Sequence, residues 1–225
     1  MLKYDVDAAE ILIYDEIGPS YWGLVGADEV SEALTQMSGK HVTVRLNSPG
    51  GSVDEGVAIY NAMRRHAGGL TVVVDGLAAS MASYLLQAGE ERVVSSNSMV
   101  MIHDPWTIAI GNAEQLRKGA DVLDKYRDRL VPDYANRSGR SQDEVRAMMS
   151  EETWMAGEEI VTAGFADRVE DGVDVAPTGL AFLGKIASKI PPKVFERAEY
   201  CRKMMQTPYP RKAAAAKMFA EVFGN

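Results

Sequence analysis

Three short segments carry residue types that could act together in nucleophilic catalysis. The first is GLAASMAS at 76–83, in which Ser80 lies between two apolar stretches and among small neighbours. A serine at a sharp strand-to-helix turn would expose its hydroxyl oxygen, and backbone N–H groups at the start of the helix would face a developing oxyanion. The alternative is a small residue that packs where a strand meets a helix, and the segment taken alone favours it.

The second segment is NSPGG at 47–51, which directly follows an apolar, β-branched run. Gly50 and Gly51 leave backbone N–H groups free to point into a cleft, as an oxyanion hole requires. An ordinary strand-to-helix turn would use the same residues, and for this segment alone it is the favoured explanation. The phosphate-binding patterns G-x-x-x-x-G-K-[ST] and G-x-G-x-x-G are absent from the sequence, so a nucleotide loop is not indicated.

The third segment is MIHDPW at 101–106, where His103 ends an apolar run. A strand end would fix the imidazole near a cleft, so His103 is the best candidate for a general base, the alternative being a histidine that caps a strand. His41 opens a predicted strand and His66 follows a basic helix end. The single cysteine, Cys201, excludes a disulfide framework, and we expect no metal site and no cofactor.

The elements that must position these segments alternate along the chain. Strands are predicted immediately before each segment, at 41–46, 70–74 and 99–102. Amphipathic or apolar helices are predicted between and around them, at 27–37, 52–66 and 80–88. This alternation predicts an α/β fold with mainly parallel pairing, in which sites lie at the carboxyl ends of strands. The three segments together therefore indicate a catalytic site more strongly than any one of them does alone.

The remaining pattern predicts one domain followed by an extension. Further strands are predicted at 10–14, 92–94 and 165–169, and further helices at 112–136, 141–149 and 157–163. The composition of the sequence changes near residue 170, from an acidic body to a basic tail. We therefore expect a domain at 1–170 and a partly helical C-terminal extension at 171–225. The extension could bind a partner or be trimmed proteolytically, although two amphipathic helices packed on the parent domain or a neighbour are favoured.

Composition excludes several classes of protein. The chain has 225 residues, 46% of them hydrophobic and 25% charged, which is typical of a globular protein. A net charge of −8 argues against a nucleic-acid binder. No apolar run approaches the ~18 residues of a membrane span, and the first residues lack the shape of a signal peptide. We expect a cytoplasmic protein with no membrane partner.

The three segments, together with EETWMAGEEIVTAGFADRV at 151–169, resemble the Clp-type serine peptidase family, the proteolytic subunit of Clp protease. The resemblance extends from Ile11 to Val169. The sequences MIHDPW and EETW resemble the phage and prophage branch of the family more than the housekeeping subunit. This branch includes head maturation proteases. The resemblance implies a Clp protease/crotonase-like α/β spiral of ββα units, with the helix at 112–136 as a long handle.

By its matching motifs, the resemblance makes Ser80 the nucleophile and His103 the general base. It places the oxyanion hole at the N–H groups of Gly51 and Met81. The segments at 51–53 and 104–108 would flank the cleft and pair with substrate as an added strand.

The acidic member of the triad is where this sequence departs from the family. An ungapped match places Met148 at the position of the family's aspartate, and methionine cannot orient an imidazole. We expect Glu152, and after it Glu151, to take this role for His103. The alternative is that both are acids in the first turn of a helix that complement its dipole. If no acid reaches His103, activity would be weak or depend on assembly. Asp167 is interpreted as structural.

The function that the resemblance implies is a serine endopeptidase that cleaves polypeptides, with a phage head maturation protease as the finer hypothesis. Family members form heptameric rings, often stacked in pairs, so a ring-shaped homo-oligomer is expected in a bacterium or phage-infected cell. An AAA+ unfoldase or phage capsid and scaffold proteins are further candidate partners. The alternatives are an inactive structural ring subunit and, less favoured, a crotonase-like acyl-CoA enzyme. The serine–histidine pair counts against the latter, because hydratases rely on carboxylates.

Overall fold

The computed structural model describes residues 2–170, and the expectations for the extension at 171–225 lie outside the described residues. The strands are β1 (Lys3–Asp5), β2 (Glu10–Ile13), β3 (Val42–Ser48), β4 (Leu70–Ala79), β5 (Glu91–Ser95), β6 (Met99–Ile102), β7 (Thr153–Ala156) and β8 (Arg168–Glu170). The helices are η1 (Ser20–Trp22), a 3-10 turn, then α1 (Ala27–Gln36), α2 (Val53–Arg65), α3 (Met81–Leu86), α4 (Ala113–Ser138), α5 (Gln142–Ser150) and α6 (Glu158–Thr162).

A mainly parallel sheet organises the molecule, as the alternation of strands and helices predicted. The described strands form one eight-stranded sheet, with the order β1-β2-β3-β4-β5-β8 and with β6 and β7 off this path. Four neighbouring pairs are parallel: β2–β3, β3–β4, β4–β5 and β5–β8. The pairs β1–β2 and β6–β7 are antiparallel. The long strand β4 pairs with β5 through Thr71–Val74 and with β6 through Leu77–Ala79. Its carboxyl end is therefore shared by β3 and β6.

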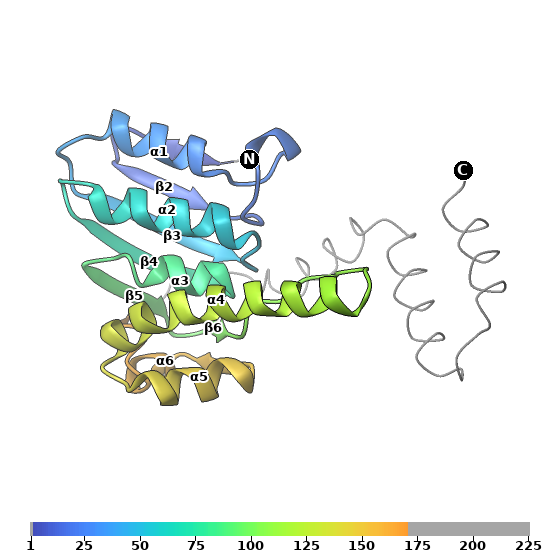
Figure 1. Ribbon diagram of the computed structural model, residues 1–225. Helices are drawn as coiled ribbons and strands as arrows, with labels where there is room; N and C mark the ends of the chain where they lie inside the picture. The colour runs from blue at the N-terminus through green and yellow to red at the C-terminus, as the bar shows by residue number, and fades with distance from the viewer. Residues whose placement is uncertain (1, 171–225) are drawn as a thin grey trace. The chain divides into compact units, whose positions relative to one another are not determined.

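Helices α1, α2 and α3 lie side by side along one face of the sheet (Figure 1). Alternate residues of β3 face them, and Val42, Val44 and Leu46 are fully buried. The helices bury their own apolar stripes against this row, for example through Ile59 and Met63 of α2. Burial of this apolar surface is the main force that holds the strand ends in register.

The long helix expected at 112–136 is α4, which is 26 residues long. It begins with a capping box in which the Asn112 and Gln115 side chains bond each other's backbone N–H groups. Its carboxyl-terminal part packs into the core through Leu130 and Tyr134. Its amino-terminal part is exposed and extends beyond the body of the domain (Figure 1).

The structure corrects several predicted boundaries. The strand predicted at 70–74 runs on to Ala79, because its second half pairs with β3 and β6. β7 was not predicted, since a short and partly exposed strand shows no clear alternation. The strand predicted at 165–169 is Arg168–Glu170, because Phe165 and Ala166 instead pack in the core after α6.

Asp167 has the structural role that the sequence suggested. Arg92 is buried and forms an ion pair with Asp167 at 2.5 Å. The same guanidinium donates hydrogen bonds to the side chain of Gln87 and to the carbonyl oxygens of Arg137 and Gly164. This one side chain therefore ties α3, the end of α4 and the turn after α6 to the sheet.

Candidate active site

The three segments singled out in the sequence meet at one edge of the sheet. Parallel pairing aligns Ser48 of β3 with Ala78 of β4, and Ala79 of β4 with Met101 of β6. The residues that follow these strands are therefore neighbours in space, although they are far apart in the sequence.

Ser80 occupies a strained turn between β4 and α3. Its φ of 54° and ψ of −124° are unusual for a residue with a side chain. Among the described residues, Ala9 and Glu152 are the other non-glycine residues with positive φ. The Ser80 N–H donates to the carbonyl oxygen of Met101 at 2.9 Å, which ties the turn to β6. Such conformations cost about 1–3 kcal/mol and persist where the surroundings enforce them.

His103 follows β6 and lies against the Ser80 hydroxyl. Its Nε2 is 2.8 Å from Ser80 Oγ. Burial lowers the pKa of His103 below its usual value of 6.5, because a partly desolvated ring resists protonation, while the nearby charges of Glu152 and Asp104 act in the opposite direction. The ring is therefore neutral near pH 7, and Nε2 can accept the hydroxyl proton.

The Gly50–Gly51 turn is fixed against both Ile17 and the Ser80 turn. Ile17 N–H donates to the Gly50 carbonyl at 2.7 Å, and Ser52 N–H donates to the Ile17 carbonyl at 2.8 Å. In this parallel bridge the N–H of Gly51 points away from Ile17. A Cβ on Gly51, whose φ is +141°, would lie 2.0 Å from the Ile17 oxygen.

Gly50 brings this turn into contact with the first residue of α3, Met81. A Cβ on Gly50, whose φ is +91°, would lie 2.7 Å from the backbone nitrogen of Met81 and 2.7 Å from Cβ of Ser80. Only glycine allows this approach. The backbone N–H groups of Gly51 and Met81 consequently belong to two adjoining turns beside the Ser80 hydroxyl.

The candidate acids differ in their placement. Met148 packs against the hydrophobic core, as an apolar side chain in that position would. Glu151 and Glu152 follow α5 and are both exposed, but only Glu152 lines the cleft beside His103. Trp154 Nε1 donates to Glu152 Oε1 at 3.1 Å and restrains the carboxylate. In the part of the chain that the structure describes, no hydrogen bond joins Glu152 to His103, so the two interact through charge.

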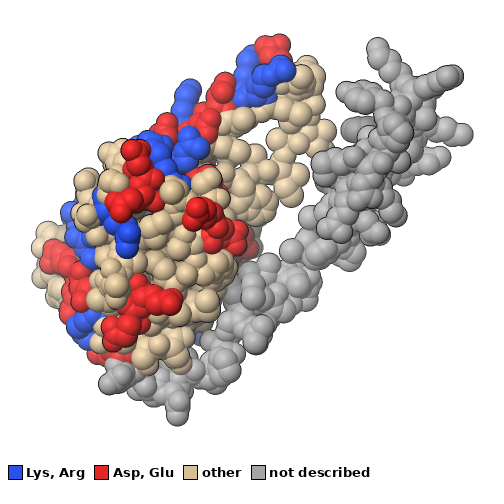
Figure 2. Space-filling model, turned by 90° about the horizontal axis from the view of Figure 1, so that it is seen from below, with Lys and Arg blue, Asp and Glu red and all other residues tan. Residues whose placement is uncertain are grey.

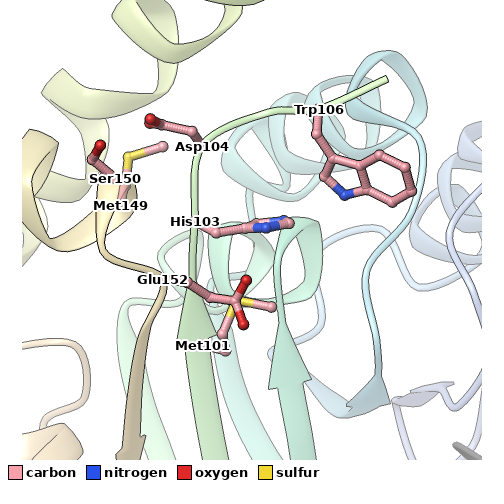
Figure 3. Close-up of a pocket in the computed structure, with 7 residues that line it drawn as sticks. All are labelled: Met101, His103, Asp104, Trp106, Met149, Ser150 and Glu152. Atoms are coloured by element: carbon pink, nitrogen blue, oxygen red, sulfur yellow. The ribbon is translucent and has the colours of Figure 1, made fainter. Parts of the chain in front are cut away.

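A cleft of about 500 Å³ opens beside His103. It is lined by Met101, His103, Asp104, Trp106, Met149, Ser150 and Glu152 (Figure 3). In Figure 3 the Glu152 carboxylate lies below the imidazole, whereas Asp104 points away from the ring toward Met149. Met149 and Ser150 could not be assigned to the site from the sequence, because they end α5, whose pattern indicates only an amphipathic helix.

Residues 2–170 offer neither a cluster of metal ligands nor a membrane-spanning helix. These residues contain no group of three or more histidine, cysteine, aspartate or glutamate side chains placed to share a metal ion. No helix within the same range has both the length and the apolar character needed to cross a bilayer.

The fold is of the Clp/crotonase-like α/β class. Residues 11–172 match the family model described as Clp protease, and the chain belongs to this family. A solved structure of a ClpP1 point mutant from Listeria monocytogenes superimposes with a TM-score of 0.66 and 24% sequence identity. The superposition covers 75% of this chain and 95% of that one, which supports the fold class predicted from the sequence.

Curated relatives bear the same family name. A protein from Bacteroides fragilis named ATP-dependent Clp protease proteolytic subunit is 38% identical over 133 residues, which cover 58% of this chain and 64% of the relative. Its counterpart from strain YCH46 of that species is also 38% identical, with 60% of the relative covered. The same subunit from Pleurastrum terricola is 33% identical over 137 residues, or 60% of this chain and 70% of the relative. The chain thus spans somewhat less than two thirds of the two bacterial relatives.

Proposed function

We propose that this protein is a serine endopeptidase of the Clp proteolytic-subunit type. The observation that carries the proposal is the 2.8 Å contact between Nε2 of His103 and Oγ of Ser80. The glycine turn supports it, because it lies against the backbone nitrogen of Met81 and Cβ of Ser80, and an oxyanion hole needs backbone N–H groups close to the nucleophile. Membership of the Clp protease family supports the same reaction.

In the proposed mechanism, His103 removes the Ser80 hydroxyl proton as Oγ attacks a peptide carbonyl carbon. The carbonyl oxygen becomes an oxyanion that accepts hydrogen bonds from the N–H groups of Gly51 and Met81. The C–N bond then breaks, and His103 returns the proton to the leaving amine. Water, activated by the same imidazole, hydrolyses the acyl-serine and restores the site.

Glu152 is the acid that we assign to this reaction. Its charge acts on His103, and Trp154 holds its carboxylate on the side of the cleft. When the imidazole gains a proton, this negative charge stabilises the imidazolium. Both glutamates are exposed, but Glu152 lines the cleft beside His103 and Glu151 does not, which favours Glu152.

An extended polypeptide is the substrate that fits this site. The segments 51–53 and 104–108 flank the Ser80–His103 pair, and a substrate strand between them would bond to both through its backbone. Trp106 and Ile108 are 69% and 73% exposed, so their side chains are available to substrate or to a neighbouring subunit.

A ring-shaped homo-oligomer is part of the proposal, with residues 1–170 as the peptidase domain. Leu116 and Val122 of α4 are 44% and 48% exposed and offer apolar contacts for a second copy. On the face shown in Figure 2, acidic side chains are interspersed with basic ones, so copies of an acidic chain can meet without a continuous repulsive surface.

The proposal extends to the partners and the location of the enzyme. Relatives named as ATP-dependent favour an AAA+ unfoldase as partner. The MIHDPW wording favours head maturation, with phage capsid or scaffold proteins as substrates. In either case we place the enzyme in the cytoplasm of a bacterium or a phage-infected host.

Two observations favour a second candidate, an inactive structural subunit of the same fold. An ungapped match to the family pattern places Met148 at the position of the aspartate, and Glu152 does not hydrogen-bond to the imidazole within the described residues. A histidine without an oriented tautomer is a weaker base, so this subunit would keep the fold and lose turnover.

Labelling with a fluorophosphonate, followed by intact-mass analysis, distinguishes the two candidates. The endopeptidase takes up one probe molecule per chain, and Ser80→Ala takes up none. The exposed serine Ser38 provides the matched control, since Ser38→Ala should label like the unchanged chain. A folded, assembled sample that takes up no probe would favour the structural subunit.

A further inference from the structure

Residues that the proposed mechanism does not use form hydrogen bonds to the carbonyl side of the peptide bond between Ser80 and Met81. The Ser80 carbonyl oxygen accepts a hydrogen bond from the Ser83 N–H at 3.0 Å and another from Ser83 Oγ at 2.6 Å. A trans peptide is planar, and its C=O and N–H point in opposite directions. Fixing the Ser80 carbonyl therefore fixes the direction of the Met81 N–H.

Tyr134 of α4 completes this arrangement. Its hydroxyl lies 2.7 Å from Ser83 Oγ and 3.5 Å from the Ser80 carbonyl oxygen. Ser83 has one hydroxyl proton, which it donates to the Ser80 carbonyl, so the Tyr134 hydroxyl donates to Ser83 Oγ. Burial raises the pKa of Tyr134 far above its usual value, so the hydroxyl keeps its proton.

The ring of Tyr134 is held as firmly as its hydroxyl. The side chain is 3% exposed and packs edge-on against Tyr84, with 5.6 Å between ring centroids, and against Phe165 at 5.9 Å. A phenol locked in this way cannot follow a movement of Ser83, so it restrains Ser83 instead.

We propose that Tyr134 is a positioning residue for the peptidase reaction. Through Ser83 it holds the Ser80–Met81 peptide so that the Met81 N–H faces the oxyanion. The inference rests on the proposed function and adds to it that α4, whose other half is exposed, helps to set the reactivity of the nucleophile.

A second tyrosine provides a matched control. The Tyr84 hydroxyl donates to the Asp133 carboxylate and also joins α3 to α4. It has the same chemistry and links the same two helices, and its hydroxyl does not bond the Ser80 carbonyl. Removing either hydroxyl weakens the α3–α4 contact. Removing the one on Tyr134 also removes a restraint on Ser83, and through it on the Ser80 carbonyl, which keeps the backbone N–H groups of Ser83 and Tyr84 as donors.

The test compares Tyr134→Phe with Tyr84→Phe in the full chain. Four properties are measured: the second-order rate constant for phosphonylation of Ser80, kcat and KM for a fluorogenic peptide, the midpoint of the pH dependence of kcat/KM, and the melting temperature. Tyr134→Phe should lower the phosphonylation rate constant and kcat about tenfold, while KM and the pH midpoint stay unchanged. Tyr84→Phe should lose similar thermal stability and keep both rates within about twofold.

The variant Ser83→Ala tests the same path independently of the tyrosine. It should also lower kcat about tenfold, and the double variant with Tyr134→Phe should be no worse than the more impaired single variant. Effects that multiply in the double variant, or normal rates in Tyr134→Phe with a lowered melting temperature, would overturn the inference. Normal rates in Tyr134→Phe beside a labelled unchanged chain would leave the proposed function standing. If the chain without substitutions takes up no probe, both the inference and the proposed function would be rejected.

Discussion

Ser80 and His103 lie 23 residues apart in the chain, yet Nε2 of His103 is 2.8 Å from Ser80 Oγ. The contact follows from the parallel pairing of β4 with β6, which aligns Ala79 with Met101 and adds a bond from Ser80 N–H to the Met101 carbonyl. Each side chain thus leaves the end of a paired strand, and the geometry does not depend on a mobile loop.

The imidazole should be essential to turnover and dispensable for folding. His103→Gln should lower kcat for peptide hydrolysis by at least about 10³-fold, because Ser80 then has no base. The measurement is initial rate with a fluorogenic peptide, with sedimentation to verify assembly. His66→Gln is the control, since His66 contacts the carbonyl oxygen of Lys40 and not the site. A variant at position 103 with near-normal kcat would remove His103 from the mechanism.

The acidic limb of the pH profile should lie below 6.5. Burial lowers the pKa of His103, so the ring stays neutral, and the enzyme active, at pH values where an exposed histidine is already protonated. Glu152 has the opposite effect on this pKa, so Glu152→Gln should move the midpoint of kcat/KM further down. It should also lower kcat about 10- to 100-fold, because the imidazolium loses a stabilising charge.

Glu151→Gln is the matched control for this experiment, because it removes the same charge one residue away. It should leave both the midpoint and kcat close to those of the unchanged chain. If Glu151→Gln produced the shift instead, the role of the acid would pass to Glu151, and if neither variant did, the triad would lack an acid.

The sequence was sufficient to locate Ser80, His103 and the glycine turn because each follows a strand with a clear local pattern. Parallel pairing then brings successive strand ends to one edge, so spatial proximity follows from topology alone. The catalytic roles of these residues remain predictions. The extent of β4 and the existence of β7 could not be predicted, because both depend on pairing with β6 rather than on local sequence.

Tyr134 and Glu152 illustrate a second limit of sequence reasoning. Tyr134 is 54 residues from Ser80 and occurs in a helix whose pattern indicates only an amphipathic surface. Its contact with Ser83 depends on how α4 packs on α3, which is a tertiary property. The sequence alone offers no physical reason to prefer Glu152 over the adjacent Glu151. The positive φ of 53° at Glu152 turns the backbone there, so the two side chains point in different directions.

The glycine turn should tolerate no side chain. Gly51→Ala would place Cβ 2.0 Å from the Ile17 oxygen at a φ of +141°, so the turn must move and carry its N–H away from the oxyanion. We expect kcat to fall about 10²- to 10³-fold, the usual cost of losing one oxyanion donor. Gly119→Ala is the control, because a Cβ there, within α4, meets nothing within 4 Å. Equal activity of the two variants would exclude Gly51 from the oxyanion hole.

The buried Arg92 should be a major determinant of stability without a part in catalysis. Arg92→Met leaves Asp167, Gln87 and two backbone carbonyls without their shared donor, so the free energy of unfolding should fall by about 3 kcal/mol or more. Arg168→Met is the control. Its ion pair with Glu91 is exposed and screened by solvent, so its loss should change the free energy of unfolding far less. Urea denaturation measures both, and a loss at Arg92 no larger than at Arg168 would mean that the α3–α4–β8 junction is held by apolar packing alone.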